Sequence, residues 1–228
     1  MNNMDLLSKY SAFIFDFDGT LADTAPDILS IIKTVIRDAG IKVPACSTEI
    51  IGPPLEQIFA SLLPGTEKEQ LNSLVAAYRA KYRTCGFPFT RVFTGIPNIL
   101  QQIYRHGKPA FIATNKPCSV SKALLESKSL LHFFKDVVSR DSIPGRCLSK
   151  RQMLEYLGDK YSLNASSALM IGDSVLDMEG ARQAGMCSAA VLYGYGSPQQ
   201  LRETGPDLLI LTESWDDIAY GPGMRELS

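Results

Sequence analysis

The sequence predicts an α/β fold, in which a Rossmann-like parallel sheet forms the core and an α-helical cap domain is inserted into it. Two patterns support this fold class. Short apolar runs of strand length alternate along most of the chain with amphipathic helical segments, as in a parallel sheet with crossover helices. One long stretch after the first strand candidate carries helical patterns alone. With 228 residues, the chain is long enough for a sheet core and an insertion.

Six apolar runs have the length and composition of buried strands. The first leads into the segment FIFDFDGTLADT, residues 13 to 24, where Asp16 and Asp18 come at the end of the run. Because ionised side chains are costly to bury, these carboxylates indicate a functional edge of the sheet. The six strand candidates are Ala12–Phe15, Ala110–Thr114, Asp136–Ser139, Ala168–Ile171, Ala189–Leu192 and Leu208–Leu211.

The segment between the first two strand candidates carries three apolar stripes with helical spacing. Pro26 favours a helix start, and Gly40 ends the first stripe. The second stripe stops at Pro64-Gly65. We expect Thr66 to cap the third helix, which Gly86 closes. The stripes are formed by Ile28, Ile31, Ile32, Val35 and Ile36; by Leu55, Ile58, Phe59, Leu62 and Leu63; and by Leu71, Leu74, Val75, Tyr78 and Tyr82.

These patterns predict a core domain of residues 1–23 and 89–228 and a helical cap domain of residues 24–88. Functional sites in open α/β sheets lie beyond the carboxyl ends of the strands, which is where Asp16 and Asp18 are found. A cap that starts at this edge would hang over both carboxylates. The alternative is that the same helices form a long crossover packed on the core.

Composition and charge favour a cytoplasmic protein that acts on small molecules. The 23 basic and 24 acidic residues leave a net charge of −1, so the chain lacks the basic character expected of a nucleic-acid-binding protein. We expect no membrane partner, because the sequence contains neither a signal peptide nor a run that could span a bilayer. The five cysteines are scattered, which indicates reduced thiols. The choice between a monomer and a homodimer stays open.

A second acidic segment, LMIGDSVLDMEGA, covers residues 169 to 181 and places Asp173 and Asp177 after another strand candidate. If the two strands are neighbours, four carboxylates converge at one edge of the sheet. Such a site needs a cation or a proton, and an all-oxygen ligand set favours Mg²⁺. A calcium-binding loop is excluded by the spacing after Asp16. Taken alone, Asp173 and Asp177 could instead be a helix N-cap and a first-turn acid.

Four segments, in this order, resemble the motifs of the haloacid dehalogenase superfamily of phosphatases and phosphotransferases. DFDGTLADT resembles the first motif, FIATNK the second with Thr114, and IGDSVLDMEGA the fourth. The third is a lysine before a helix, for which Lys150 in CLSKRQML is the best match. The resemblance extends from Phe13 to about Thr212.

Lys150 is favoured over Lys135 and Lys160 because a capping-box pattern places it at a helix start. The pattern is formed by Ser149 and Gln152. In one respect the chain departs from the family: phosphoglycolate phosphatases usually have Lys-Pro at this point, whereas here Arg151 follows the lysine.

The resemblance implies a role for each acidic residue of these motifs. Asp16 is the nucleophile that forms an aspartyl-phosphate, and Asp18 is the general acid and base. Mg²⁺ is held by Asp16, the backbone carbonyl of Asp18 and Asp173. Asp177 is either a further ligand or a carboxylate that orients bound water.

The resemblance also implies how phosphate is bound. Thr114, the backbone N–H of Asn115 and Lys150 hold the phosphoryl oxygens. Gly19 fits a tight turn close to the phosphate. Lys116 is interpreted either as a substrate contact or as a solvated lysine at the strand end.

The expected cap contains a stiff loop, Gly52-Pro53-Pro54, in the stretch IIGPPLEQIF. We expect Pro54 and Glu56 to face the substrate, although a plain turn between helices is the alternative. This stretch resembles phosphoglycolate-phosphatase-like and nucleotidase-like members, as does VLYGYGS at residues 191 to 197.

The resulting prediction is an Mg²⁺-dependent phosphomonoester hydrolase, phosphoglycolate-phosphatase-like, that acts on a small soluble phosphate ester. The alternatives are a nucleotidase or an inorganic pyrophosphatase of the same superfamily, a sugar phosphomutase, or a non-catalytic binding protein. Asp18 and the Asp173/Asp177 pair argue against the metal-free dehalogenases. Thr20 argues against the phosphomutases, which commonly have valine there.

Overall fold

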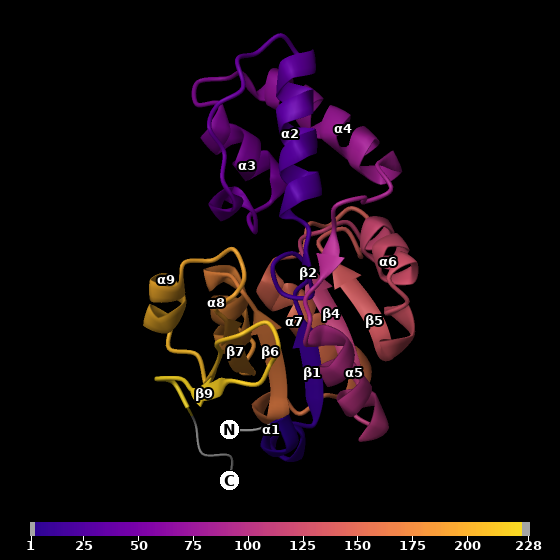
Figure 1. Cartoon of the computed structure of the whole chain (residues 1–228), viewed down its shortest axis with the longest axis vertical. Helices are drawn as coiled ribbons and strands as arrows, with labels where there is room; N and C mark the ends of the chain where they lie inside the picture. Colours follow the sequence, from indigo (N-terminus) through magenta and orange to yellow (C-terminus); the bar gives the residue numbers. More distant parts are fainter. Residues whose placement is uncertain (1–2, 225–228) are drawn as a thin grey trace.

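The computed structural model describes residues 3–224, and this part of the chain forms a seven-stranded sheet (Figure 1). The strand order is β5-β4-β1-β6-β7-β8-β9, and every pair is parallel except β8 and β9. The strands are β1 (Ala12–Phe15), β4 (Ala110–Thr114), β5 (Phe134–Ser139), β6 (Ala168–Gly172), β7 (Cys187–Val191), β8 (Leu208–Ile210) and β9 (Ile218–Tyr220).

This topology confirms the predicted fold class and all six strand candidates, whose ends shift by at most two residues. The first and fourth candidates are neighbours, since Phe15 of β1 lies beside Ile171 of β6. The antiparallel edge strand β9 was not predicted. Its three residues, one of which is exposed, are too few to form a hydrophobic period.

Both faces of the sheet are buried, as expected for a parallel sheet. Phe13 and Phe15 of β1 pack into one core with α1, α5 and α6, whereas Ile14 packs into a second core with α7 and α8. The helices of the sheet domain are α1 (Asn3–Lys9), α5 (Ile96–Arg105), α6 (Cys118–Ser127), α7 (Lys150–Tyr161), α8 (Val175–Gln183) and α9 (Pro198–Glu203), with 3₁₀ turns η2 (Leu131–Phe133) and η3 (Ala165–Ser167).

The chain between β2 and β3 is helical: α2 (Ala25–Asp38), η1 (Thr48–Ile50), α3 (Leu55–Leu62) and α4 (Lys68–Thr84). Figure 1 shows these helices as a separate group beyond the edge at which β1 ends. Pro26 lies in the first turn of α2, as predicted. The prediction for Thr66 is wrong, because α4 begins at Lys68 and Glu67 occupies its N-cap.

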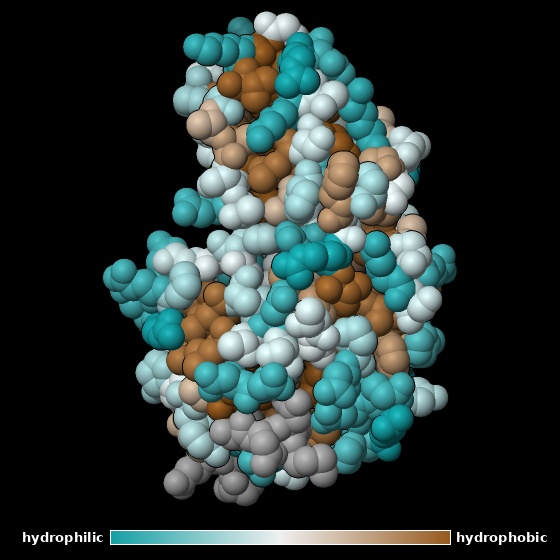
Figure 2. All heavy atoms as spheres, viewed as in Figure 1, coloured by the Kyte–Doolittle hydropathy of each residue, from teal (hydrophilic) through white to brown (hydrophobic). Residues whose placement is uncertain are grey.

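Two linkers connect the helical group to the sheet, and they are paired with each other. They contain the short antiparallel strands β2 (Ala22–Asp23) and β3 (Arg91–Val92). In addition, the buried Asp27 carboxylate in α2 accepts a 2.7 Å hydrogen bond from the Thr90 hydroxyl. The two connections therefore form one narrow neck. On one side of this neck, the space-filling view shows a notch between the two lobes (Figure 2).

Within residues 3–224, we find no helix that combines the length and the apolar character needed to cross a membrane.

Candidate active site

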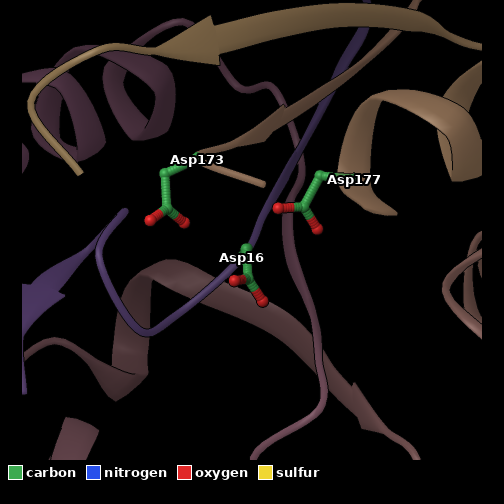
Figure 3. A group of neighbouring side chains, drawn as sticks. All are labelled: Asp16, Asp173 and Asp177. Atoms are coloured by element: carbon green, nitrogen blue, oxygen red, sulfur yellow. The ribbon is translucent and has the colours of Figure 1, made fainter. Parts of the chain in front are cut away.

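Three carboxylates meet at the carboxyl edge of the sheet. Asp16 follows β1, Asp173 follows β6, and Asp177 lies in the first turn of α8. One carboxylate oxygen from each residue lies within 4.8 Å of the others, and all three residues are buried (Figure 3). The parallel pairing of β1 with β6 causes this approach, because it brings the ends of both strands to the same edge.

The start of α8 shows whether Asp173 and Asp177 cap the helix or face the site. Ser174, and not Asp173, is the N-cap, so the N-cap alternative for Asp173 is wrong. Asp177 does complete the capping box, with one oxygen 2.6 Å from the Ser174 hydroxyl. Its other oxygen points toward the shared space and pairs with Lys150. Asp177 therefore supports the helix and faces the site at the same time.

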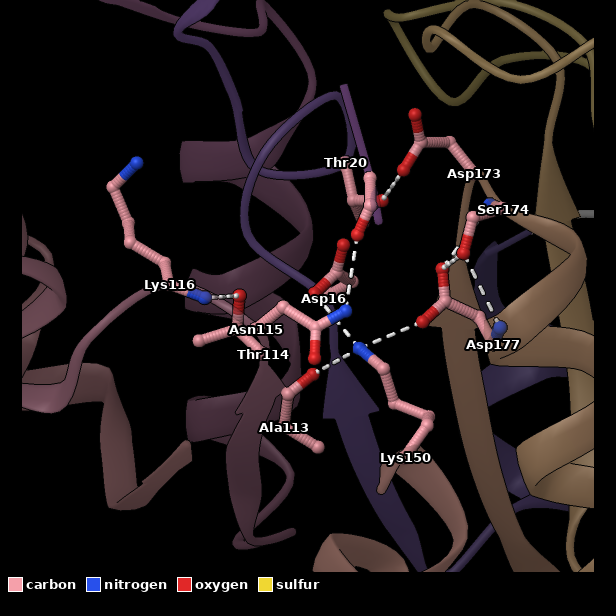
Figure 4. A network of polar contacts seen from close by, with 11 residues as sticks. Asp16, Thr20, Ala113, Thr114, Asn115, Lys116, Lys150, Asp173, Ser174 and Asp177 are labelled. Carbon is pink, nitrogen blue, oxygen red and sulfur yellow. Dashed lines mark hydrogen bonds and ion pairs between the residues drawn. The ribbon is translucent and has the colours of Figure 1, made fainter. Parts of the chain in front are cut away.

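Lys150 lies between two of these carboxylates. Its Nζ is 2.9 Å from Asp16 Oδ1 and 2.7 Å from Asp177 Oδ1, and it donates to the carbonyl of Ala113 at 2.6 Å (Figure 4). The capping box of Ser149 with Gln152 forms as predicted at the start of α7.

The other two lysines considered from the sequence lie elsewhere. Lys160 pairs with Asp136, and Lys135 lies over the Tyr161 ring. Of the three candidate lysines, only Lys150 reaches the acidic cluster.

One lysine does not balance three buried carboxylates. Burial raises the pKa of Asp173 well above its ordinary value, and the charges of Asp16 and Asp177 raise it further. Burial also raises the pKa of Asp16, although Lys150 opposes this shift. The cluster is therefore short of positive charge. Three oxygen ligands in a buried, electron-rich space fit a hard divalent cation such as Mg²⁺.

Asp18 lines the same pocket as Asp16, but its side chain is not part of the group of three carboxylates. Asp18 Oδ1 instead accepts 2.6 Å hydrogen bonds from the Thr24 hydroxyl and from Lys116 Nζ. Its carboxylate thus faces the helical group. This orientation leaves only the backbone carbonyl of Asp18 as a candidate metal ligand.

The environment of Lys116 could not be predicted from the sequence. Its side chain is only 2% exposed, which rules out a solvated lysine at the strand end. Its Nζ donates to the Tyr82 hydroxyl at 2.6 Å and lies over the Phe17 and Tyr82 rings. Lys116 therefore connects Asp18 to α4 of the helical group. The sequence around Lys116 does not reveal this environment, because the Phe17 and Tyr82 rings come from distant positions in the chain.

The second motif lies at the end of β4. Thr114 is buried and lines the pocket, and its hydroxyl accepts a hydrogen bond from the Lys116 N–H. Asn115 also lines the pocket, and its side-chain amide donates to the carbonyl of Gly52 at 3.0 Å. This bond joins the sheet to the loop before α3.

Gly19 occupies a position that no other residue fits. Its φ is +80°, and a Cβ atom there would lie 2.1 Å from Asp173 Oδ2. The turn after β1 therefore packs directly against the Asp173 carboxylate. Glycine permits this close approach because it has no Cβ atom.

A pocket of about 560 Å³ lies between the helical group and the sheet. Asp16, Asp18 and Thr114 line its reactive end, and Pro54 and Glu56 line the wall from the helical group. Glu56 is 2.7 Å from Arg79 and 3.6 Å from Arg140. It therefore bridges α4 and the sheet.

Basic residues gather in this pocket in addition to the predicted set. Arg140 follows β5 and is held beside the second motif, because its N–H donates to the Thr114 carbonyl at 3.2 Å. The pocket is also lined by Arg79, Arg83 and Arg146. These residues could not be selected from the sequence, because they come from α4 and from a loop more than fifty positions later.

Comparison with known proteins gives consistent results. A family model described as haloacid dehalogenase-like hydrolase matches residues 13–191. A 5'-nucleotidase from Pseudomonas aeruginosa is 31% identical over 204 residues, which cover 89% of this chain and 91% of that protein. A phosphoglycolate phosphatase from Aliivibrio fischeri is 29% identical over 206 residues, which cover 86% and 89%.

A solved structure from Streptococcus pneumoniae, a haloacid dehalogenase-like hydrolase, superposes with a TM-score of 0.80 at 28% identity. The superposition covers 89% of this chain and 94% of that one.

Proposed function

Because the chain belongs to the haloacid dehalogenase-like hydrolases, we propose that it is an Mg²⁺-dependent phosphomonoester hydrolase that works through an aspartyl-phosphate. The observation that carries this proposal is the position of Asp16. Its carboxylate lies at the end of a central strand and at the reactive end of the pocket, beside Lys150. Asp18, two residues later, faces the leaving-group side of that pocket.

The reaction has two steps. In the first, an oxygen of Asp16 attacks phosphorus, the bond to the leaving oxygen breaks, and Asp18 gives that oxygen a proton. In the second, water attacks the aspartyl-phosphate while Asp18 takes up a proton, which releases phosphate and restores Asp16. Thr114 and Lys150 hold the phosphoryl oxygens during both steps.

The residues that would hold Mg²⁺ are Asp16, Asp173 and the backbone carbonyl of Asp18, with Asp177 as a further ligand or as an orienting group. The charge deficit of the buried cluster supports this assignment. Bound Mg²⁺ would offset the repulsion between an anionic nucleophile and an anionic phosphate. Thr20 holds Asp173 in place through a 3.1 Å hydrogen bond, which the valine of a phosphomutase could not make.

For the substrate, we place a phosphoglycolate-like ester first and a nucleoside monophosphate second. The phosphoglycolate phosphatase relative supports the first choice. The second has the support of the 5'-nucleotidase relative and of a pocket whose 560 Å³ exceeds what glycolate needs. Inorganic pyrophosphate is the third choice. All five cysteines lie within the described residues as free thiols, which supports action in the cytoplasm.

The test is hydrolysis of p-nitrophenyl phosphate with and without Mg²⁺, followed by a panel of phosphorylated metabolites ranked by kcat/KM. We expect turnover that needs Mg²⁺ and disappears in Asp16→Asn. The variant should melt no lower than the wild type, because the substitution relieves charge repulsion without opening a cavity. Residual activity above about one hundredth of wild type would disprove the role of Asp16, since loss of a covalent nucleophile costs far more.

A further inference from the structure

Tyr195 lies in the loop after β7 and contacts both the acidic cluster and the neck of the helical group. Its backbone N–H donates to Asp173 Oδ2 at 2.7 Å. Its hydroxyl accepts hydrogen bonds from the N–H groups of Thr24 at 2.7 Å and Ala25 at 2.9 Å, and donates to Asp23 Oδ1 at 2.9 Å. One residue therefore joins a proposed metal ligand to the first linker.

The hydroxyl of Tyr195 uses its full hydrogen-bonding capacity in these contacts. A phenol has one proton to donate and two lone pairs, and here it makes one donation and accepts twice. Burial raises the pKa of Tyr195, so the hydroxyl stays neutral and keeps the proton that it gives to Asp23.

This hydroxyl also supplies the cap that α2 lacks. The N-cap Thr24 makes no capping bond of its own, because its side chain donates to Asp18. Tyr195 instead pairs with two of the N–H groups that the start of a helix leaves free. The orientation of α2 thus depends on a residue that is distant in sequence, 171 positions after Thr24.

The loop that carries Tyr195 packs directly on Asp173. A Cβ atom on Gly194 would lie 2.3 Å from the Asp173 Cβ, so only glycine lets the loop approach Asp173 this closely. A change in the position of the Asp173 carboxylate must therefore move the loop or break the bond to the Tyr195 N–H. Through Asp23, which is 3.6 Å from Arg91, the contact continues into the second linker.

We propose that Tyr195 is a positioning residue that transmits the occupancy of the metal site at Asp173 to the linkers of the helical group. The proposal rests on the Mg²⁺ site of the proposed function. With a cation held by Asp173, this carboxylate would be a weaker acceptor for the Tyr195 N–H. A weaker bond there would let the Tyr195 hydroxyl shift relative to the first turn of α2, and the orientation of the helical group would change with it.

Hydrogen exchange of the full-length protein, in EDTA and in Mg²⁺, tests this coupling without substrate. In the wild type, we expect Mg²⁺ to change the exchange rate of peptides covering residues 20–28 and 87–92 by at least about fivefold, the lower end of typical coupling between sites. In Tyr195→Phe, both peptides should exchange at a rate that no longer depends on Mg²⁺. A peptide from β4 should be unaffected.

Tyr193→Phe is the matched control, because Tyr193 lies in the same loop but its hydroxyl bonds to the Thr20 carbonyl and to Trp215. It should respond to Mg²⁺ as the wild type does. If Tyr195→Phe does not fold, Asp23→Ala removes the acceptor of the same hydroxyl and is expected to reduce the response.

Calorimetric titration of the wild type with Mg²⁺ separates the two proposals. Absence of binding would overturn the metal site and the coupling together. If Mg²⁺ binds but Tyr195→Phe keeps the full response of its linkers, the coupling alone is overturned and the proposed hydrolase stands.

Discussion

At the scale of single residues, the acidic positions differ in environment although they share a chemical type. Asp16, Asp173 and Asp177 lie around one buried space, where the charges of Asp16 and Asp177 disfavour the ionised form of Asp173. Asp18 lies outside that space and is held by Lys116 and Thr24. This separation suits two different functions. The clustered carboxylates can bind a cation, and the Asp18 carboxyl group can exchange a proton with a leaving group.

Asp18→Asn should separate the two half-reactions. The amide neither gives nor takes the proton, while Asp16 can still attack. In single-turnover phosphorylation, alkyl phosphates should therefore lose about 10²- to 10⁴-fold in rate, the usual contribution of general acid catalysis, and p-nitrophenyl phosphate should lose much less. Equal losses for the two esters would show that Asp18 is not the general acid.

Lys150→Met should impair both activity and folding. The substitution leaves the buried carboxylates of Asp16 and Asp177 without their cation, so we expect a lower Tm in EDTA. It also removes a phosphoryl contact, which should lower kcat by about 10² to 10³. The exposed Lys135→Met is the control and should change neither quantity. Wild-type kcat in the Lys150 variant would mean that another group holds the phosphate.

At the scale of elements, the loop before α3 and the first turn of α3 each contact the sheet domain at one point. The Gly52 carbonyl accepts from Asn115, and Glu56 reaches Arg140 across the pocket. Pro54 precedes α3 directly and limits the movement of this loop. The loop therefore places its side chains opposite the reactive end without belonging to the sheet.

Changes in this loop should alter substrate preference more than stability. For Pro54→Gly and Glu56→Ala, we expect the ratio of kcat/KM for the best natural substrate to kcat/KM for p-nitrophenyl phosphate to fall by about tenfold, or about 1.4 kcal/mol. Glu69→Ala, at an exposed position of α4, serves as the control. A constant ratio across both loop variants would indicate a purely structural loop.

At the scale of the whole molecule, we propose that residues 24–88 form a mobile cap. The narrow β2–β3 neck carries both chain connections between the helical group and the sheet. The contacts across the pocket include the hydrogen bond between Asn115 and Gly52. Closure would exclude water during phosphoryl transfer, and opening would admit the water that completes the reaction.

Mg²⁺ should stabilise the protein in a pH-dependent manner. Burial raises the pKa of Asp16 to about 6. Without metal, the folded protein therefore binds this proton more tightly than the unfolded chain does. The free energy of unfolding then falls as pH rises from the pKa of Asp16 in the unfolded chain to about 6. Mg²⁺ needs the ionised carboxylates, so its effect grows over the same range. At a hundredfold excess over Kd near pH 7.5 we expect about 2.7 kcal/mol, or an increase in Tm of about 5 to 10 °C.

Thermal melts in EDTA and in Mg²⁺ between about pH 5 and 7.5 provide the measurement, since this range brackets the raised carboxyl pKa. Asp173→Asn is the matched variant and should lose most of the metal response. An increase in Tm that is larger at the acidic end would contradict the assignment of the buried carboxylates as ligands.

The sequence by itself determined the parallel sheet, because apolar runs of strand length and helical periods are local properties of the chain. It also predicted that Asp16 and Asp173 meet if their two strands are neighbours, and the pairing of β1 with β6 meets that condition. The helix start at Lys150 was predictable for the same reason: Ser149 and Gln152 lie within one turn of it.

Only the tertiary structure decided the features that depend on distant partners or on very short elements. β9 and the β2–β3 neck have two or three residues per strand, too few to show a period. The direction of Asp18 depends on Lys116, 98 positions away, and the cap of α2 comes from Tyr195, 171 positions after Thr24. Side-chain hydrogen bonds are decided by distances in space, and residues so far apart become neighbours only when the whole sheet has formed.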